Sequence, residues 1–281
     1  MSIPVVVQPY WKSLATAYMD VGPPLRPSSE DISFLKQVLT SLPRGSAFHA
    51  LLLGVTPEIA RLPLPEGSFL TAVDTSEPMA QAVWPGDVPG RRQVVCSDWL
   101  ALPLHDRCCD VVIADGSLNC VPFPNGLRAL AASVRRAMRD DGILAVRCFV
   151  RPASPERPED IFADMLRGTI PSFHHCKFRL LMAMQKSTEQ GVQVGETHRL
   201  WTNQNFDRTL LAFGPGWDAR DIDTIELYRN KNTVHSFPTL AELRSVLADF
   251  FDEVSLLIPS YNLGERCPTL VLRPRDSGDS V

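Results

Sequence analysis

Residues 48–58, FHALLLGVTPE, decide the fold of this chain. The run ALLL at 50–53 has the continuous apolar character of a strand buried on both faces of a parallel sheet. Gly54 ends the run, and Thr56 can cap a helix because a proline and a glutamate, both favoured in a first helical turn, follow it. The stretch therefore predicts a strand that ends in a tight turn, where the backbone can approach a ligand.

A second apolar run, residues 69–73, ends in Asp74, twenty residues after Gly54. This offset suits a carboxylate that accepts hydrogen bonds from ribose hydroxyls, with Thr75 beside it at the same strand end. The alternative is that Asp74 only caps the helix predicted from Ser76. A glycine turn followed by an acidic strand end favours a nucleoside ligand.

Strands and helices alternate over the first half of the chain, so the right-handed crossover rule predicts a parallel, doubly wound α/β sheet. Near the C-terminus, a capping box at Thr239 starts a helix, and a proline-bounded connection lets the last two strands pair antiparallel. The strands expected after Asp74 are 93–96, 110–114, 143–146, 254–258 and 269–272, and the expected helices are 28–42, 76–84, 127–138 and 239–250.

The regular alternation stops between Arg151 and His235. There the sequence predicts helices at 160–167 and 177–186 and an extended segment at 192–202. An insertion of this size after a fifth strand is typical of a cap over a site. We divide the chain into an N-terminal arm (1–27), a cofactor-binding half (28–150), a cap (151–235), a C-terminal helix with two strands (236–273) and a flexible tail (274–281).

Composition narrows the classes of partner. With 281 residues, 44% of them hydrophobic, the chain can fill a sizeable core. A net charge of −4 gives no general attraction to nucleic acid or anionic membranes, and no apolar run has membrane-spanning length. We expect a cytoplasmic protein with a small-molecule partner and no metal. The sequence leaves the oligomeric state open, with a homodimer among the alternatives. The seven cysteines lack a CxxC pair, and those expected as small core residues are Cys96, Cys108, Cys109, Cys120 and Cys148.

The order of strand ends resembles the class I S-adenosylmethionine-dependent methyltransferases over roughly residues 28–150 and 237–273. In that family the first strand ends in a glycine loop beside the methionyl group, and the second in an acid for the ribose. The third ends in an acid and an apolar residue at the adenine, and the fourth in a substrate-side loop. The matching residues here are Gly54, Asp74, Asp98 with Trp99, and Asp115, Gly116 and Ser117.

This resemblance implies a Rossmann-like sheet of seven strands with the last strand antiparallel, S-adenosylmethionine as cofactor and a small-molecule acceptor. Each residue also has a plainer interpretation: Asp98 and Asp115 as turn acids and Trp99 as a packing residue. The loop LLLGVTPE has one glycine where the family has two or three. That loop suits a pyrophosphate poorly and so disfavours a nicotinamide-dependent oxidoreductase, while a non-catalytic methyltransferase-like module remains an alternative.

The segments outside the sheet are expected to close over the cofactor. In the arm, Arg26 could pair with the methionyl carboxylate, and Trp11 and Tyr18 could face the sulfonium. Packing of both aromatic residues on the outside of the helices is the alternative. The catalytic residue stays open, because each histidine of the cap is more typical of a structural or surface position. The weak candidates for a base are His174, His175, His198 and His235.

Overall fold

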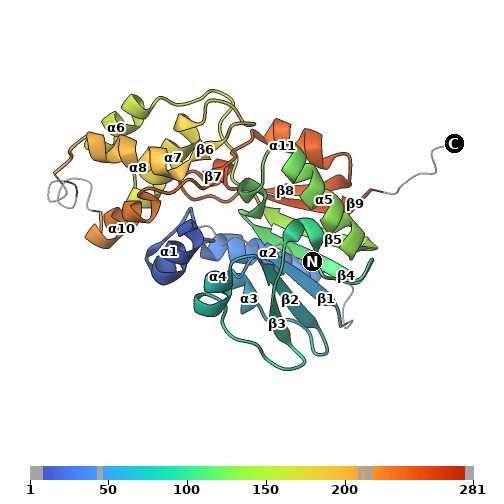
Figure 1. Ribbon diagram of the computed structural model, residues 1–281. Coiled ribbons are helices and arrows are strands. Elements are labelled where there is room, and N and C mark those ends of the chain that lie inside the picture. Colours follow the sequence, from blue (N-terminus) through green and yellow to red (C-terminus); the bar gives the residue numbers. More distant parts are fainter. Residues whose placement is uncertain (1–8, 43–46, 208–210, 212–216, 276–281) are drawn as a thin grey trace.

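The structure, a computed structural model, describes residues 9–42, 47–207, 211 and 217–275. A seven-stranded sheet forms the base, and a helical cap stands at one of its edges, with α1 between them (Figure 1). The strand order is β3-β2-β1-β4-β5-β9-β8, and β9 runs antiparallel to both of its neighbours. The predicted doubly wound sheet with an antiparallel last strand is confirmed.

The central strands are apolar along their whole length because helices cover both faces of the sheet. In β1, Leu51 and Leu53 pack on one face with α5 and α11, while Ala50 and Leu52 pack on the other with α2 and α3. The strands are β1 His49–Leu53, β2 Phe69–Asp74, β3 Arg92–Cys96, β4 Cys109–Asp115, β5 Met138–Arg147, β8 Phe251–Leu257 and β9 Thr269–Pro274.

Two of the helices of this layer begin at capping boxes, and the sequence predicts the one at Thr239. Ser28 exchanges hydrogen bonds with Asp31 at the start of α2, and Thr239 does so with Glu242 at the start of α11. These contacts satisfy backbone N–H groups that a helix start leaves free. The helices are α1 Pro9–Ala17, α2 Ser29–Ser41, α3 Pro57–Ala60, α4 Glu77–Ala82, α5 Asn125–Ala137 and α11 Leu240–Leu247.

The cap, yellow to orange in Figure 1, has a hydrophobic cluster of its own. One prediction for it is wrong, because residues 194–203 form a helix instead of extended chain. Val194, His198 and Trp201 are buried at helical spacing, so packing of one helical face overrides the local strand preference. The cap contains α6 Pro158–Leu166, α7 Phe173–Met184, β6 Val192–Gln193, α8 Val194–Asn203, α10 Ala219–Asp223, the 3-10 helix η4 Thr224–Tyr228 and β7 Val234–His235.

A buried arginine joins the sheet to the arm. The Arg147 side chain at the end of β5 is 2% exposed, and its Nε donates to Asp115 Oδ1 at 2.6 Å. Its Nη1 donates to the Pro24 carbonyl at 2.9 Å and lies 3.9 Å from Asp31 Oδ2. Burial raises the pKa of the Asp115 carboxyl, and Arg147 opposes that rise. The guanidinium therefore links strands β4 and β5, the arm and helix α2.

Two further predictions, on the burial of the cysteines and on membrane-spanning segments, can be compared with the structure. Cys109 and Cys148 are buried as expected, whereas Cys96 is exposed at the end of the edge strand β3, so its assignment to the core is wrong. No helix among the described residues is long and apolar enough to cross a membrane. Residues 1–8 of the arm and 276–281 of the predicted tail lie outside the described part of the chain.

Candidate functional site

A pocket of about 370 Å³ lies where the arm, the carboxyl ends of the parallel strands and the cap meet. Ligands of open α/β sheets bind at this edge. The pocket brings together every residue that the sequence predicts at the cofactor. From the arm come Trp11, Tyr18 and Arg26, and from the strand ends Gly54, Thr56, Asp74, Thr75, Asp98, Trp99, Asp115, Gly116 and Ser117.

Gly54 keeps the floor of this pocket open. Its φ of +105° is a conformation that side chains rarely adopt, and a Cβ there would lie 4.0 Å from both Asp74 Oδ2 and Trp99 Cζ2. The Val73 carbonyl accepts from the Gly54 N–H at 2.8 Å and from Trp99 Nε1 at 2.6 Å. The ends of β1 and β2 and the segment after β3 thus surround one small space between an acid and an indole ring.

Asp74 keeps one carboxylate oxygen for a ligand. Its Oδ1 accepts from the Ser76 N–H at 2.7 Å, while Oδ2, on the Gly54 side, has no hydrogen-bond partner among the described residues. The cap of α4 is Ser76, whose side chain accepts from the Met79 N–H, so Asp74 is not the capping residue. Burial raises the pKa of Asp74 to about 6, against the opposing Ser76 N–H.

Asp98 and Thr56 differ in how well they match their predicted roles. Asp98 Oδ1 accepts from the Leu100 N–H at 2.9 Å, so the turn-acid interpretation accounts for one of its two oxygens. Thr56 is the N-cap residue of α3, but its side chain makes no capping hydrogen bond, and that part of the prediction is wrong. Its hydroxyl interacts instead with Tyr18 of the arm.

At the end of β4, two side chains serve the fold. Ser117 Oγ donates to the Leu53 carbonyl at 2.8 Å, and Asp115 is paired with Arg147. Between them, Gly116 has a φ of +64°, and a Cβ there would come within 2.7 Å of the Phe149 ring. This loop therefore presents mainly backbone to the pocket.

The arm is fastened over the pocket by Arg26. Its Nε and Nη2 both donate to Glu58 Oε1, and its Nη1 donates to the carbonyls of Tyr18 and Val21 at 3.1 and 3.2 Å. The guanidinium also lies 4.5 Å from the centre of the Tyr18 ring. With these donors engaged inside the protein, Arg26 holds the arm against α3, and its predicted pairing with the methionyl carboxylate gains no support. The Trp11 ring lies 6.1 Å from that of His235, between arm and cap.

Of the four histidines predicted as candidate bases, His235 alone lines this pocket. Its ring is buried, and burial lowers its pKa to about 4, with the Asn119 carbonyl opposing. The Nδ1 atom has no hydrogen-bond partner among the described residues. The segment is held in place by Gln185, which donates to the Phe237 carbonyl and accepts from the Phe237 N–H. His235 is therefore a fixed, neutral imidazole at the pocket wall.

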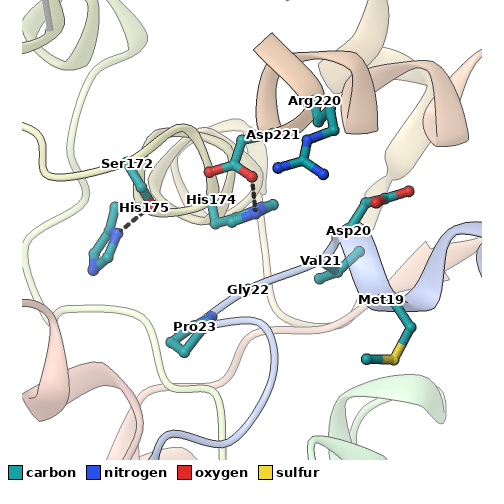
Figure 2. A pocket seen from close by; sticks show the side chains of 10 residues that line it. All are labelled: Met19, Asp20, Val21, Gly22, Pro23, Ser172, His174, His175, Arg220 and Asp221. Atoms are coloured by element: carbon teal, nitrogen blue, oxygen red, sulfur yellow. Dashed lines mark hydrogen bonds and ion pairs between the residues drawn. The ribbon is translucent and has the colours of Figure 1, made fainter. Parts of the chain in front are cut away.

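The other histidines lie elsewhere. His174 and His175 line a separate open cleft of about 430 Å³ between the arm and the cap. Figure 2 shows the side chains that line it. There His174 Nε2 lies 3.4 Å from Asp221 Oδ1, and His175 Nδ1 is 2.8 Å from Ser172 Oγ. His198 Nε2 lies 3.3 Å from a Glu226 oxygen and outside both cavities. These three imidazoles have partners of their own and do not reach the cofactor side.

Sequence patterns missed the residues that complete the cap side of the pocket. They carry aromatic rings, an amide and an amine, and four of them come from the arm, the cap or the residues just after the cap, where strand and helix do not alternate. For Tyr10, the one sequence signal of a place at the pocket is that it directly precedes Trp11, which is predicted at the cofactor. The missed residues are Tyr10, Asn119, Phe149, Lys177, Tyr228 and Phe237.

Comparison with known proteins bears on this site. Residues 51–146 match the family model described as a methyltransferase domain. This segment of the chain is a methyltransferase domain. The match covers β1 to β5, where Gly54, Asp74, Asp98 and Asp115 lie, so the resemblance to the S-adenosylmethionine-dependent family is confirmed, and with it the cofactor expected for this methyltransferase.

Solved structures agree on the fold of the methyltransferase. A protein of Rhodobacter sphaeroides described as a Zn-dependent alcohol dehydrogenase is 12% identical, with a TM-score of 0.62 and coverage of 95% of this chain and 97% of its own. The PH0226 protein of Pyrococcus horikoshii is 14% identical, with a TM-score of 0.51 and coverage of 92% and 98%. Identities this low show a shared fold and no shared activity. No curated protein matches the chain.

Proposed function

We propose that this methyltransferase transfers a methyl group from S-adenosylmethionine to a small molecule held between the strand ends and the cap. The observation that carries the proposal is one continuous pocket, which extends from Gly54 and Asp74 at the strand ends to Lys177 and His235 in the cap. A pocket of about 370 Å³ with an aromatic wall is in the range of small-ligand sites.

The strand-end residues fit the cofactor. Asp74 Oδ2 is free to accept from ribose hydroxyls, and the space above Gly54 would be filled by any side chain at that position. Asp98 lies at the next strand end, where a carboxylate can accept from the adenine amino group, and the indole of Trp99 is fixed beside it by the Val73 carbonyl. The cofactor supplies an activated methyl group on sulfur, so positioning of the acceptor contributes much of the acceleration.

His235 is proposed to remove the proton of a hydroxyl acceptor. Its imidazole is neutral at physiological pH because burial lowers its pKa to about 4, and its Nδ1 has no partner among the described residues. A general base must be unprotonated and within hydrogen-bond reach of the proton that it takes. An acceptor with a neutral amine would need only the positioning.

We expect His235→Gln to lower the rate of methylation of hydroxyl acceptors by about 100-fold or more, the usual contribution of a general base. S-Adenosylmethionine affinity should stay within about twofold, because the residue lies on the cap side. Release of S-adenosylhomocysteine with a panel of phenols measures the rate, and His105→Gln at an exposed position is the matched control. A phenol methylated equally fast by both variants would remove His235 from the mechanism.

Calorimetric titration tests the function itself. S-Adenosylmethionine and S-adenosylhomocysteine should both bind, whereas NAD should not. The inosyl analogue of S-adenosylhomocysteine should bind about tenfold more weakly, because it lacks the amino group that Asp98 is proposed to accept from. Binding of NAD alone would refute the proposed function, and equal affinity for the adenosyl and inosyl ligands would refute the role of Asp98.

A further inference from the structure

The cap side of the pocket, which we call the acceptor compartment, is defined by Tyr10, Phe149, Lys177, Tyr228, His235 and Phe237. Its rings stand edge to face: the Tyr10 ring centre is 5.8 Å from those of both Tyr228 and His235, and the His235 and Phe237 centres are 6.5 Å apart. Aromatic edges and faces of this kind pack well against a flat ring. The compartment therefore favours an aromatic ligand.

Lys177 is the feature of this compartment that packing does not explain. Its side chain on α7 is 1% exposed, and its Nζ donates to Thr224 Oγ1 at 2.7 Å. The Nζ lies 5.1 Å from the centre of the Tyr228 ring and 5.8 Å from that of Phe173. Within the described chain, no carboxylate lies within 4.0 Å of this amine. One neutral hydroxyl and two ring faces are the surroundings of a buried cation.

A buried ammonium without a paired anion is unfavourable, because desolvation is offset only by an opposite charge and hydrogen bonds. Burial accordingly lowers the pKa of Lys177 to about 7, although Asp221 opposes this at longer range. The other cation on the pocket wall, Arg26, is already paired with Glu58. Lys177 thus lines the pocket, and among the described residues its amine is hydrogen-bonded to a neutral hydroxyl and joined in no ion pair.

We propose that the acceptor is an aromatic compound with a carboxylate, and that Lys177 binds this carboxylate in the acceptor compartment. The inference deepens the proposed function and rests on it. An incoming carboxylate supplies the missing anion and accepts N–H donors that Thr224 leaves free, since an ammonium has three. The rings of the compartment then hold the aromatic body.

The plainer alternative is that Lys177 only joins α7 to η4 through Thr224. A structural lysine would affect folding, but it would not distinguish an acid from its amide. The test is therefore a comparison of two ligands of nearly equal size and shape, the anionic 4-hydroxybenzoate and the neutral 4-hydroxybenzamide, titrated into the full chain saturated with S-adenosylhomocysteine. We expect the acid to bind at least tenfold more tightly than the amide.

In Lys177→Met this preference should vanish, with the amide binding as it does to the native chain. Lys186→Met, which removes an exposed lysine just beyond α7, is the control and should keep the preference. Equal binding of acid and amide to the native chain would overturn the inference, and this comparison needs no variant to fold. A preference that persists in folded Lys177→Met would overturn it as well. Failure of S-adenosylhomocysteine itself to bind would instead refute the proposed function.

Discussion

Replacing Arg147 with methionine is expected to lower the free energy of unfolding by about 3 to 5 kcal/mol, the usual cost of removing one partner of a buried ion pair. The substitution leaves the buried Asp31 and Asp115, whose side chain is 8% exposed, without their cation. It also removes the donor to the Pro24 carbonyl, which holds the arm to the sheet. The stability and the closed pocket thus depend on the same guanidinium.

Denaturant unfolding of the native chain and the variant measures this loss. The matched control is Arg275→Met, because Arg275 pairs with Asp252 in an exposed position where both side chains are about half exposed. Exposed pairs contribute little, so this control should change the free energy by less than about 1 kcal/mol. If both variants lose the same small amount, the cluster around Arg147 does not join the arm to the sheet as described.

Replacing Asp74 with asparagine is expected to weaken S-adenosylmethionine binding by about 1.5 to 3 kcal/mol, equivalent to a 10- to 150-fold rise in Kd. The change removes the charge that strengthens hydrogen bonds from ribose hydroxyls while keeping an oxygen for the Ser76 N–H. Calorimetry measures the Kd, with Asp141→Asn at an exposed position as control. An unchanged Kd in the folded variant would end the ribose assignment.

The same substitution should stabilise the chain without ligand. Burial raises the pKa of Asp74 from 3.8 to about 6, so the folded state holds a proton that the unfolded state has lost between those values. Stability therefore falls as pH rises through that window, by up to about 3 kcal/mol at neutral pH. Asparagine removes this penalty. We expect Asp74→Asn to unfold at a higher temperature than the native chain at pH 7.5 and to lose that advantage near pH 4.

The affinity of the native chain for the cofactor should decrease below pH 6, because Asp74 is then protonated and loses its charge.

The fold could be predicted because its signals are local. An apolar run that stops at Gly54, an acid at Asp74 and the capping boxes at Ser28 and Thr239 each occupy a few consecutive residues. The offsets between these signals reflect the repeat of strand and helix. Every residue expected at the cofactor consequently lies on one pocket.

The acceptor side could not be predicted in the same way. Lys177, Tyr228 and His235 become neighbours through packing of the cap, and no short pattern marks which face of α7 or η4 points at the pocket. The helix at 194–203 was predicted as extended, although its burial follows a helical period. Among four equivalent histidines, position in three dimensions alone separates His235 from the rest.

The contacts of the arm have a consequence for the order of events during synthesis on the ribosome. Residues 9–31 are made well before the residues that hold them: Pro24 is held by Arg147, and the Pro9 carbonyl accepts from Lys231 Nζ. Glu30 accepts from the backbone and hydroxyl of Ser260, 230 residues further along the chain. Contacts this distant in sequence form late. The arm must therefore wait for segments made more than 200 residues later before it can settle, and the pocket is completed only after those segments have been made.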